Sequence, residues 1–317
     1  MICFVSKAND RGKAEGTKWK QGFILLPLLL FLMVCSGMVL CFMLRVYQEA
    51  EAAREFVCRK QLESIAQSFM STALQQEQDT EITNAVYQLN PLQPGNNEVQ
   101  ASVTVNKIED LGLRFLKVDV TDSCSNEFIL RQCSMSLPEP LLRQFADSSL
   151  ILAGSKVQEK SEKKDMDTIT RNANGAAFPQ LSVEEIAIWD VTDFPSVLDL
   201  QRDGLSGWIY LCRKELSLPK GLNVNGDGIL AFADDVTIGD NTVFTGRIII
   251  LADRSLRIGS HVKLENALLL CRGKLTIGSD SVINGAVMVQ QDAVLDGNAT
   301  ITGDREVLEP FNSIISF

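Results

Sequence analysis

The sequence predicts a membrane-anchored α+β chain that ends in a triangular β-helix. Three observations predict this fold class. Residues 22–44 form an uncharged apolar run, residues 45–80 contain neither glycine nor proline, and residues 207–304 repeat with a period of 19 to 20 residues. These stretches correspond to a transmembrane helix, an amphipathic helix that continues it, and a solenoid.

The repeat is clearest at four glycines, Gly239, Gly259, Gly278 and Gly297, which follow one another at spacings of 20, 19 and 19. An isoleucine precedes the first three, and Asp296 precedes the fourth. Short strand-like pieces alternate with Gly, Asn or Asp, three pieces to a unit, and this pattern indicates three faces and three corners. A leucine-rich repeat has a similar period but needs a helical segment that these units lack. We therefore expect about five β-helix coils, with the glycines at corners where φ is positive.

Charge is unevenly distributed along the 317 residues, whose net charge is −10. Residues 1–44 carry five basic and two acidic residues, a net charge of +3, which leaves −13 on residues 45–317. Nucleic-acid binding requires clustered Lys and Arg, so the acidic part argues against that class of partner. His261 is the single histidine, which removes most histidine-based catalysis and most zinc sites.

The N-terminal region predicts a single membrane crossing. The 23 uncharged residues of 22–44 can span a hydrocarbon core of about 30 Å as a helix. The basic leader, residues 1–21, favours a cytoplasmic N-terminus. The amphipathic helix over 45–80 would then lie on the opposite side of the membrane.

The residues around this crossing resemble the N-terminus of type IV pilin-like proteins. Lys18-Trp19-Lys20-Gln21-Gly22-Phe23 precedes the apolar run, and in that family a prepilin peptidase cuts after the glycine. The resemblance implies cleavage between Gly22 and Phe23. Major pilins carry Glu at the fifth mature position, where this chain has Pro27, and this departure points to minor pilins or to the K-type pseudopilins of type II secretion. The alternative is an uncleaved signal anchor.

Residues 85–154 predict a small pilin-like α/β section. Strand patterns over 98–108, 111–120 and 127–135, separated by short turns, indicate an antiparallel meander. Cys124 and Cys133 would form a local disulfide in an oxidising compartment, or would stay reduced. Residues 155–206 are interpreted as a charged linker with a segment that caps the solenoid. The tail 305–317 would cap the other end or dock into a partner.

Two alternatives compete with a purely structural function. Hexapeptide-repeat acyltransferases are also triangular β-helices, and His261 would be the base, but the repeat is not a strict multiple of six. Corner aspartates would offer calcium ligands, although the nonapeptide of calcium-bound solenoids is missing. The solenoid also resembles the bactofilins, on the repeats 236–240 and 275–279, which implies a cytoplasmic membrane-anchored scaffold.

The interpretation that best joins these patterns is a non-enzymatic structural protein of the bacterial envelope. It would be a minor pilin-like or pseudopilin-like subunit of the inner membrane, with a single crossing and a periplasmic or extracellular C-terminal part. Its expected partners are the lipid bilayer and proteins of a pilus or secretion assembly. We expect no cofactor, no metal, no nucleic acid and no small-molecule substrate.

Overall fold

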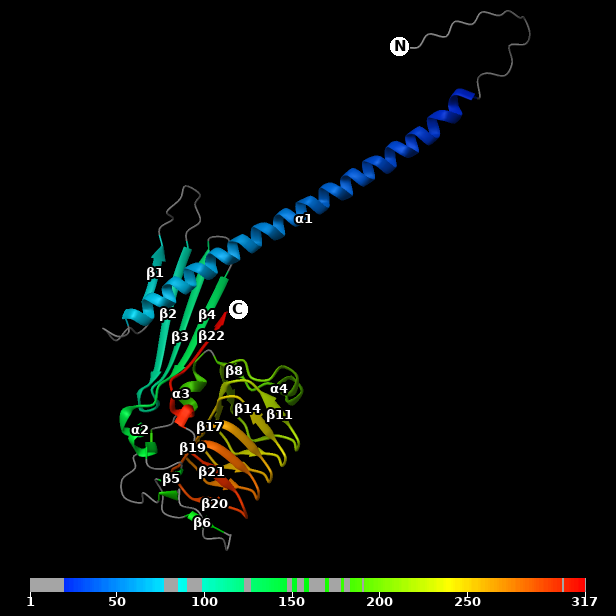
Figure 1. Ribbon diagram of the computed structural model, residues 1–317. Coiled ribbons are helices and arrows are strands. Elements are labelled where there is room, and N and C mark those ends of the chain that lie inside the picture. Colours follow the sequence, from blue (N-terminus) through cyan, green and yellow to red (C-terminus); the bar gives the residue numbers. More distant parts are fainter. Residues whose placement is uncertain are drawn as a thin grey trace, which may run out of the picture. The chain divides into compact units, whose positions relative to one another are not determined.

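The computed structural model describes residues 20–76, 85–89, 99–122, 127–146, 150–152, 157–159, 169–170, 178–179, 183–189, 191–303 and 305–316. The chain divides into two compact units, Met1–Gln61 and Leu62–Phe317. The described part of the first unit is helical. The second unit contains the end of the same helix, a small sheet and the solenoid (Figure 1).

The helix α1 (Lys20–Gln76) includes both the predicted membrane segment and its continuation. It contains Pro27 two turns from its start, where the missing N–H removes one helical hydrogen bond. Nearly all side chains between residues 26 and 61 are exposed, including the large apolar ones of 26–44. It is the one described helix that is long and apolar enough to cross a membrane.

In the second unit, five antiparallel strands form one sheet. Its order is β1 (Ala85–Leu89), β2 (Val99–Ile108), β3 (Leu113–Asp122), β4 (Glu127–Met135) and β22 (Phe311–Ser316). The 3-10 turn η1 (Glu109–Leu111) and Gly112, whose φ is 59°, join β2 to β3. The predicted meander is therefore present as β2, β3 and β4.

The end of α1 covers one face of this sheet. Leu62, Ala66, Met70 and Ala73 are spaced three or four residues apart, so they lie on one side of the helix. They share a buried cluster with alternate residues of β2, β3 and β4, which are Ala101, Val103, Val105, Leu116, Val118, Val120, Phe128 and Leu130. The helix and the sheet therefore form one α/β layer pair, as the sequence predicted.

The C-terminal segment takes a place that the sequence analysis did not anticipate. We expected residues 305–317 to cap the solenoid or to dock into a partner. Instead, all six residues of β22 pair with β4, from Phe311 opposite Met135 to Ser316 opposite Leu130. The chain thus returns to the first sheet and supplies its fifth strand, and the solenoid lies between β4 and β22 in the sequence.

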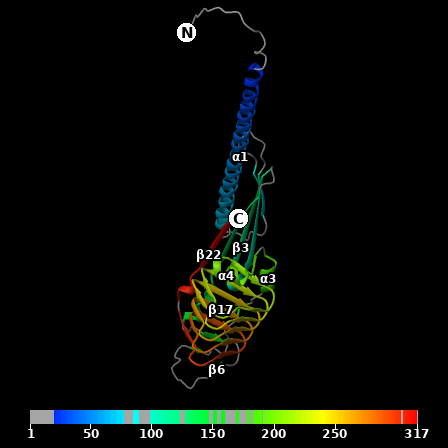
Figure 2. The same cartoon turned by 90° about the vertical axis from the view of Figure 1, so that its right-hand side faces the viewer.

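The solenoid begins at β9 and is built from parallel strands. The first coil contains β9 (Ile209–Cys212), β10 (Leu216–Ser217) and β11 (Asn223–Asn225), and the second contains β12 (Gly228–Phe232), β13 (Val236–Ile238) and β14 (Val243–Thr245). The third contains β15 (Ile248–Ala252), β16 (Leu256–Ile258) and the start of β17 (Lys263–Cys271), and the fourth contains the end of β17, β18 (Leu275–Ile277) and the start of β19 (Val282–Val289). The fifth contains the end of β19, β20 (Ala293–Leu295) and β21 (Thr300–Thr302). Figure 2 shows the coils stacked one on another. The predicted β-helix is confirmed.

Inward side chains stack on their equivalents in adjacent coils. Ile238, Ile258 and Ile277 are in register, and each is at most 1% exposed. Their partner in the last coil is Leu295, whereas the sequence alignment put Asp296 in this position. The alignment of the last unit was therefore wrong by one residue, because that coil is one residue shorter than the coil before it.

Segments outside the repeats cover both ends of the solenoid. At the last coil, β5 (Leu150–Leu152) and β6 (Val157–Glu159) pair with β19 and β20, and β7 (Ile169–Thr170) pairs with β5. They add a partial sixth coil to the five in the repeat. At the first coil, β8 (Thr192–Asp193) pairs with β9, beside α3 (Val183–Ala187) and α4 (Val197–Asp203).

The small sheet and the solenoid share a hydrophobic core. Phe115 of β3 lies 5.4 Å from Trp208 and 5.7 Å from Trp189, measured between ring centroids. Trp208 and Phe115 are at most 1% exposed. The helix α2 (Glu139–Ala146) contributes Leu141 and Phe145 to the same core. The second unit is therefore one packed body.

Candidate functional site

The predicted anchor and processing positions lie at the start of α1. Gly22 and Phe23 are in the first turn of the helix, and the apolar run follows without interruption. No described carboxylate occupies positions 26 to 44. This part of the helix offers an apolar surface without charged side chains, so it suits contact with lipid or with another apolar helix.

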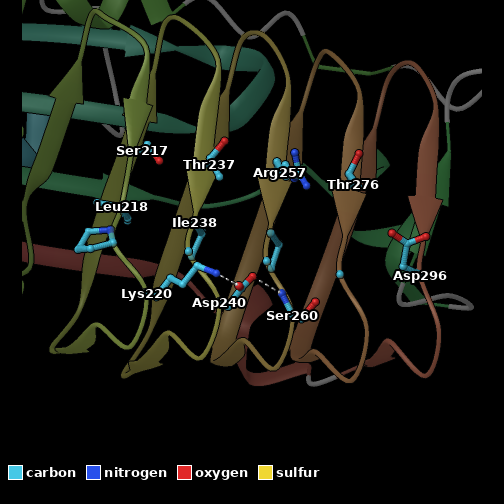
Figure 3. Close-up of a pocket in the computed structure, with 15 residues that line it drawn as sticks. Ser217, Leu218, Lys220, Thr237, Ile238, Asp240, Arg257, Ser260, Thr276 and Asp296 are labelled. Carbon is cyan, nitrogen blue, oxygen red and sulfur yellow. Dashed lines mark hydrogen bonds and ion pairs between the residues drawn. The ribbon is translucent and has the colours of Figure 1, made fainter.

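Besides the anchor, the structure has a polar groove on one corner of the solenoid. The groove has a volume of about 410 Å³, and residues of five successive coils line it. Its first side is a row of outward residues at equivalent positions of β10, β13, β16 and β18 (Figure 3). These residues are Ser217, Thr237, Arg257 and Thr276.

The opposite side of the groove is a network of charges and hydroxyls. The Nζ atom of Lys220 lies 2.6 Å from Oδ2 of Asp240, and the backbone N–H of Ser260 donates to Oδ1 of Asp240 at 3.0 Å. The hydroxyl of Ser279 donates to that of Ser260 at 3.3 Å. The hydrogen bond from Lys220 is the main cause that lowers the pKa of Asp240, so this carboxylate is ionised at neutral pH.

Between these two sides, three of the predicted corner glycines form the floor. A Cβ atom on Gly278 would lie 2.6 Å from the carbonyl carbon of Gly259, and one on Gly239 would lie 2.6 Å from the carbonyl carbon of Pro219. Only a residue without a side chain lets adjacent coils approach so closely. Gly259 has the same constraint.

The expected role of these glycines therefore needs correction. Positive φ does not occur at Gly239, Gly259 or Gly278, but two residues later, at Asn241, His261 and Asp280. Gly297, in the shorter last coil, does have a positive φ, of 59°. The first three positions are glycine because adjacent coils approach closely there, and not because the turn needs a positive φ at these residues.

Arg257 stands out within the groove because its guanidinium forms no hydrogen bond or ion pair with another described residue, although its charge helps to lower the pKa of Asp240. It is an exposed side chain on β16, in the middle of the first row. Two arginines at nearby solenoid corners are paired: Arg254 with Asp234 at 3.2 Å and Arg272 with Asp253 at 3.0 Å. The groove thus contains one cation that is available to a ligand.

The other chemistry-bearing residues lie elsewhere. His261 is in an exposed turn, with Nδ1 4.0 Å from Oδ2 of Asp280, and it does not line the groove. Among the described residues, no three His, Cys, Asp or Glu side chains gather as a metal site would require. Cys133 is buried with a free thiol, and burial raises its pKa. Cys124 lies outside the described residues, so the predicted disulfide stays a prediction.

Sequence analysis missed the groove residues, although a signal for them was present. Four residues recur at the repeat spacing, and each is adjacent in the sequence to at least one inward-facing apolar residue. They are Ser217, Thr237, Arg257 and Thr276. Comparing outward positions of the aligned units would have placed these side chains in one row.

Comparison with known proteins gives no relative for this chain. No protein-family model matches it, and neither a curated protein nor a solved structure is significantly similar to it.

Proposed function

We propose that this protein is a membrane-anchored structural subunit of the bacterial cell envelope, of the minor pilin or pseudopilin kind. The observation that carries this proposal is the division of α1. Its first part exposes an uncharged apolar surface over residues 26–44, and its last part, from Leu62, packs on an antiparallel sheet. A helix with these two environments combines an anchor with the spine of a folded head.

The rest of the second unit supports a structural role. Parallel strands that stack coil on coil give a rigid rod whose length is set by the number of repeats. In this proposal the solenoid is a spacer or a recognition surface on the outer side of the inner membrane. Its partners are the bilayer and the other proteins of a pilus or secretion assembly.

The main rival is a cytoplasmic scaffold that polymerises end to end through its solenoid. Such polymerisation requires exposed coil ends, since open strand edges pair with other chains. Here β8 covers the first coil along β9, and β5 and β6 cover the last coil. This arrangement favours the anchored subunit over the polymer.

Membrane insertion is tested with a matched pair of substitutions. Met33→Lys places a charge near the middle of the apolar run, which costs roughly 3 kcal/mol in insertion. Gln48→Lys adds the same charge beyond the run. We expect the first variant to be partly lost from the carbonate-washed membrane fraction and the second to be retained. Equal retention of both would contradict a membrane-spanning role for residues 22–44.

Topology is tested with two reporters joined by a flexible linker after Phe317. Alkaline phosphatase is active only outside the cytoplasm, and a green fluorescent protein exported in unfolded form is dark outside it. The proposal predicts an active phosphatase fusion and a dark fluorescent fusion. The opposite pair of results would favour the cytoplasmic scaffold.

A further inference from the structure

We propose that the groove over Ser217–Lys220, Thr237–Asp240 and Arg257–Ser260 binds a linear polysaccharide, laid across the coils along the solenoid axis. The inference goes beyond the proposed function and does not depend on the side of the membrane on which the solenoid lies. It is based on the direction, the spacing and the chemistry of the groove.

The direction follows from the row of outward side chains. The row consists of equivalent positions of successive coils, so it runs across the strands and not along any single strand (Figure 3). Its residues are Ser217, Thr237, Arg257 and Thr276. Neighbouring strands lie about 4.8 Å apart, so five coils span roughly 19 Å. A linear polysaccharide also repeats the same unit along one direction, so that each coil can meet one sugar.

The chemistry of the groove also fits a hydroxyl-rich polymer. Both sides present hydroxyls, from Thr237 and Thr276 on one side and Ser260 on the other. Asp240 is an ionised acceptor, and Arg257 is an unpaired donor with a planar guanidinium. Sugar hydroxyls both donate and accept, so they can pair with each of these groups, whereas the glycine floor leaves room for the rings.

Other extended ligands fit less well. A peptide that binds to a sheet uses free backbone groups at an edge, but β13, β16 and β18 already pair on both sides. A nucleic acid needs an excess of cations, whereas Lys220 and Arg257 in the groove are balanced by Asp240 and Asp296. A linear glycan needs neither.

The test measures binding of linear oligosaccharides of two to six sugars to the full chain in detergent micelles. The panel contains β-1,4-linked oligomers of N-acetylglucosamine, β-1,4-linked oligomers of glucose, and α-1,4-linked oligomers of galacturonic acid. We expect at least one series to bind with an affinity that rises with length and levels off near five sugars, the number of coils that line the groove. No binding by any series, or binding that does not depend on length, would overturn the proposal.

Substitutions then locate the site. The double variant Thr237→Val, Arg257→Gln removes one hydroxyl and the unpaired guanidinium from the same row, and we expect affinity to fall about tenfold or more. The control is Lys263→Gln, an exposed cation on a different face of the same solenoid. Because all three positions are at the surface, the fold is preserved, and circular dichroism checks this. Equal affinities of the double variant and the control, or preferential binding of extended peptides by the wild-type chain, would refute a glycan site in this groove.

Discussion

The contact between Arg247 and the C-terminal segment gives the sharpest stability prediction. Arg247 lies between β14 and β15, and its guanidinium donates to the carbonyls of Val307 and Pro310, each at 3.0 Å. The guanidinium also lies 5.6 Å from the centre of the Phe311 ring. One side chain of the solenoid therefore holds the turn η2 (Arg305–Leu308) and the start of β22.

The magnitude follows from these contacts. Each hydrogen bond from a charged donor is worth about 1.5 kcal/mol at the lower end of the usual range, which suits a partly exposed side chain. The contact with the aromatic ring adds about 0.5 kcal/mol. Arg247→Ala should therefore weaken the docking of β22 by about 3.5 kcal/mol, since the two carbonyls lose their donor.

Hydrogen exchange followed by mass spectrometry measures this loss locally. A change of about 3.5 kcal/mol in local opening corresponds to roughly 300-fold faster exchange of the β22 amides, while the solenoid core keeps its protection. Arg247→Lys should give an intermediate rate, because an ammonium group does not form the same planar fork.

The matched control is Arg254→Ala. Arg254 makes an exposed ion pair with Asp234, which is worth about 0 to 1 kcal/mol. If Arg247→Ala and Arg254→Ala change the exchange of β22 equally, the reasoning about the Arg247 contact is wrong.

Three further predictions concern the solenoid. Gly278→Ala should lower the free energy of unfolding by about 1 to 3 kcal/mol, because its Cβ would meet the backbone of Gly259 at 2.6 Å; a thermal melt unchanged from wild type would contradict the close approach. Burial raises the pKa of Cys271 to about 12, so its thiol should react with iodoacetamide at pH 8 only after unfolding. Fast labelling of Cys271 itself in the native chain, located by peptide mass mapping, would argue against its burial. The hydrogen bond from Lys220 is the main cause that lowers the pKa of Asp240, so the ionised carboxylate stabilises the fold above the ordinary pKa of 3.8, and this stabilisation is lost as the pH falls through the lower pKa of the folded state. Asp240→Asn should therefore reduce the loss of stability on acidification. An acid unfolding curve identical to that of the wild type would count against the pairing of Asp240 with Lys220.

Local and periodic patterns were sufficient to predict the helix, the meander and the β-helix. The long helix follows from an uninterrupted apolar run and from the absence of glycine and proline over 45–80. The solenoid follows from a repeat in which Ile238, Ile258 and Ile277 recur at the coil spacing. Such signals are available to sequence reasoning because each one involves neighbouring or regularly spaced residues.

The features that sequence reasoning missed depend on contacts between distant segments. The pattern of β22 was visible as an apolar tail, but nothing in it identified β4 as its partner. The strands β5 and β6 have only three residues each, too few for a periodic signal. Arg247 binds backbone carbonyls, which leave no mark on the residue types of their segment.

The role of the glycines shows a different limit. A recurring Ile-Gly pair predicts a corner, but it does not distinguish a positive φ from a close approach of two backbones. In the structure, the left-handed conformation belongs to Asn241, His261 and Asp280, and the glycines two residues earlier allow the coils to approach. The distinction depends on the distance between coils, which the sequence does not contain.

The intact mass of the protein purified from membranes tests the proposal that α1 anchors a pilin-like subunit. We expect a mature chain that begins at Phe23, following cleavage after Gly22. A chain that still begins at Met1 would contradict pilin-like processing and would leave α1 as an uncleaved signal anchor.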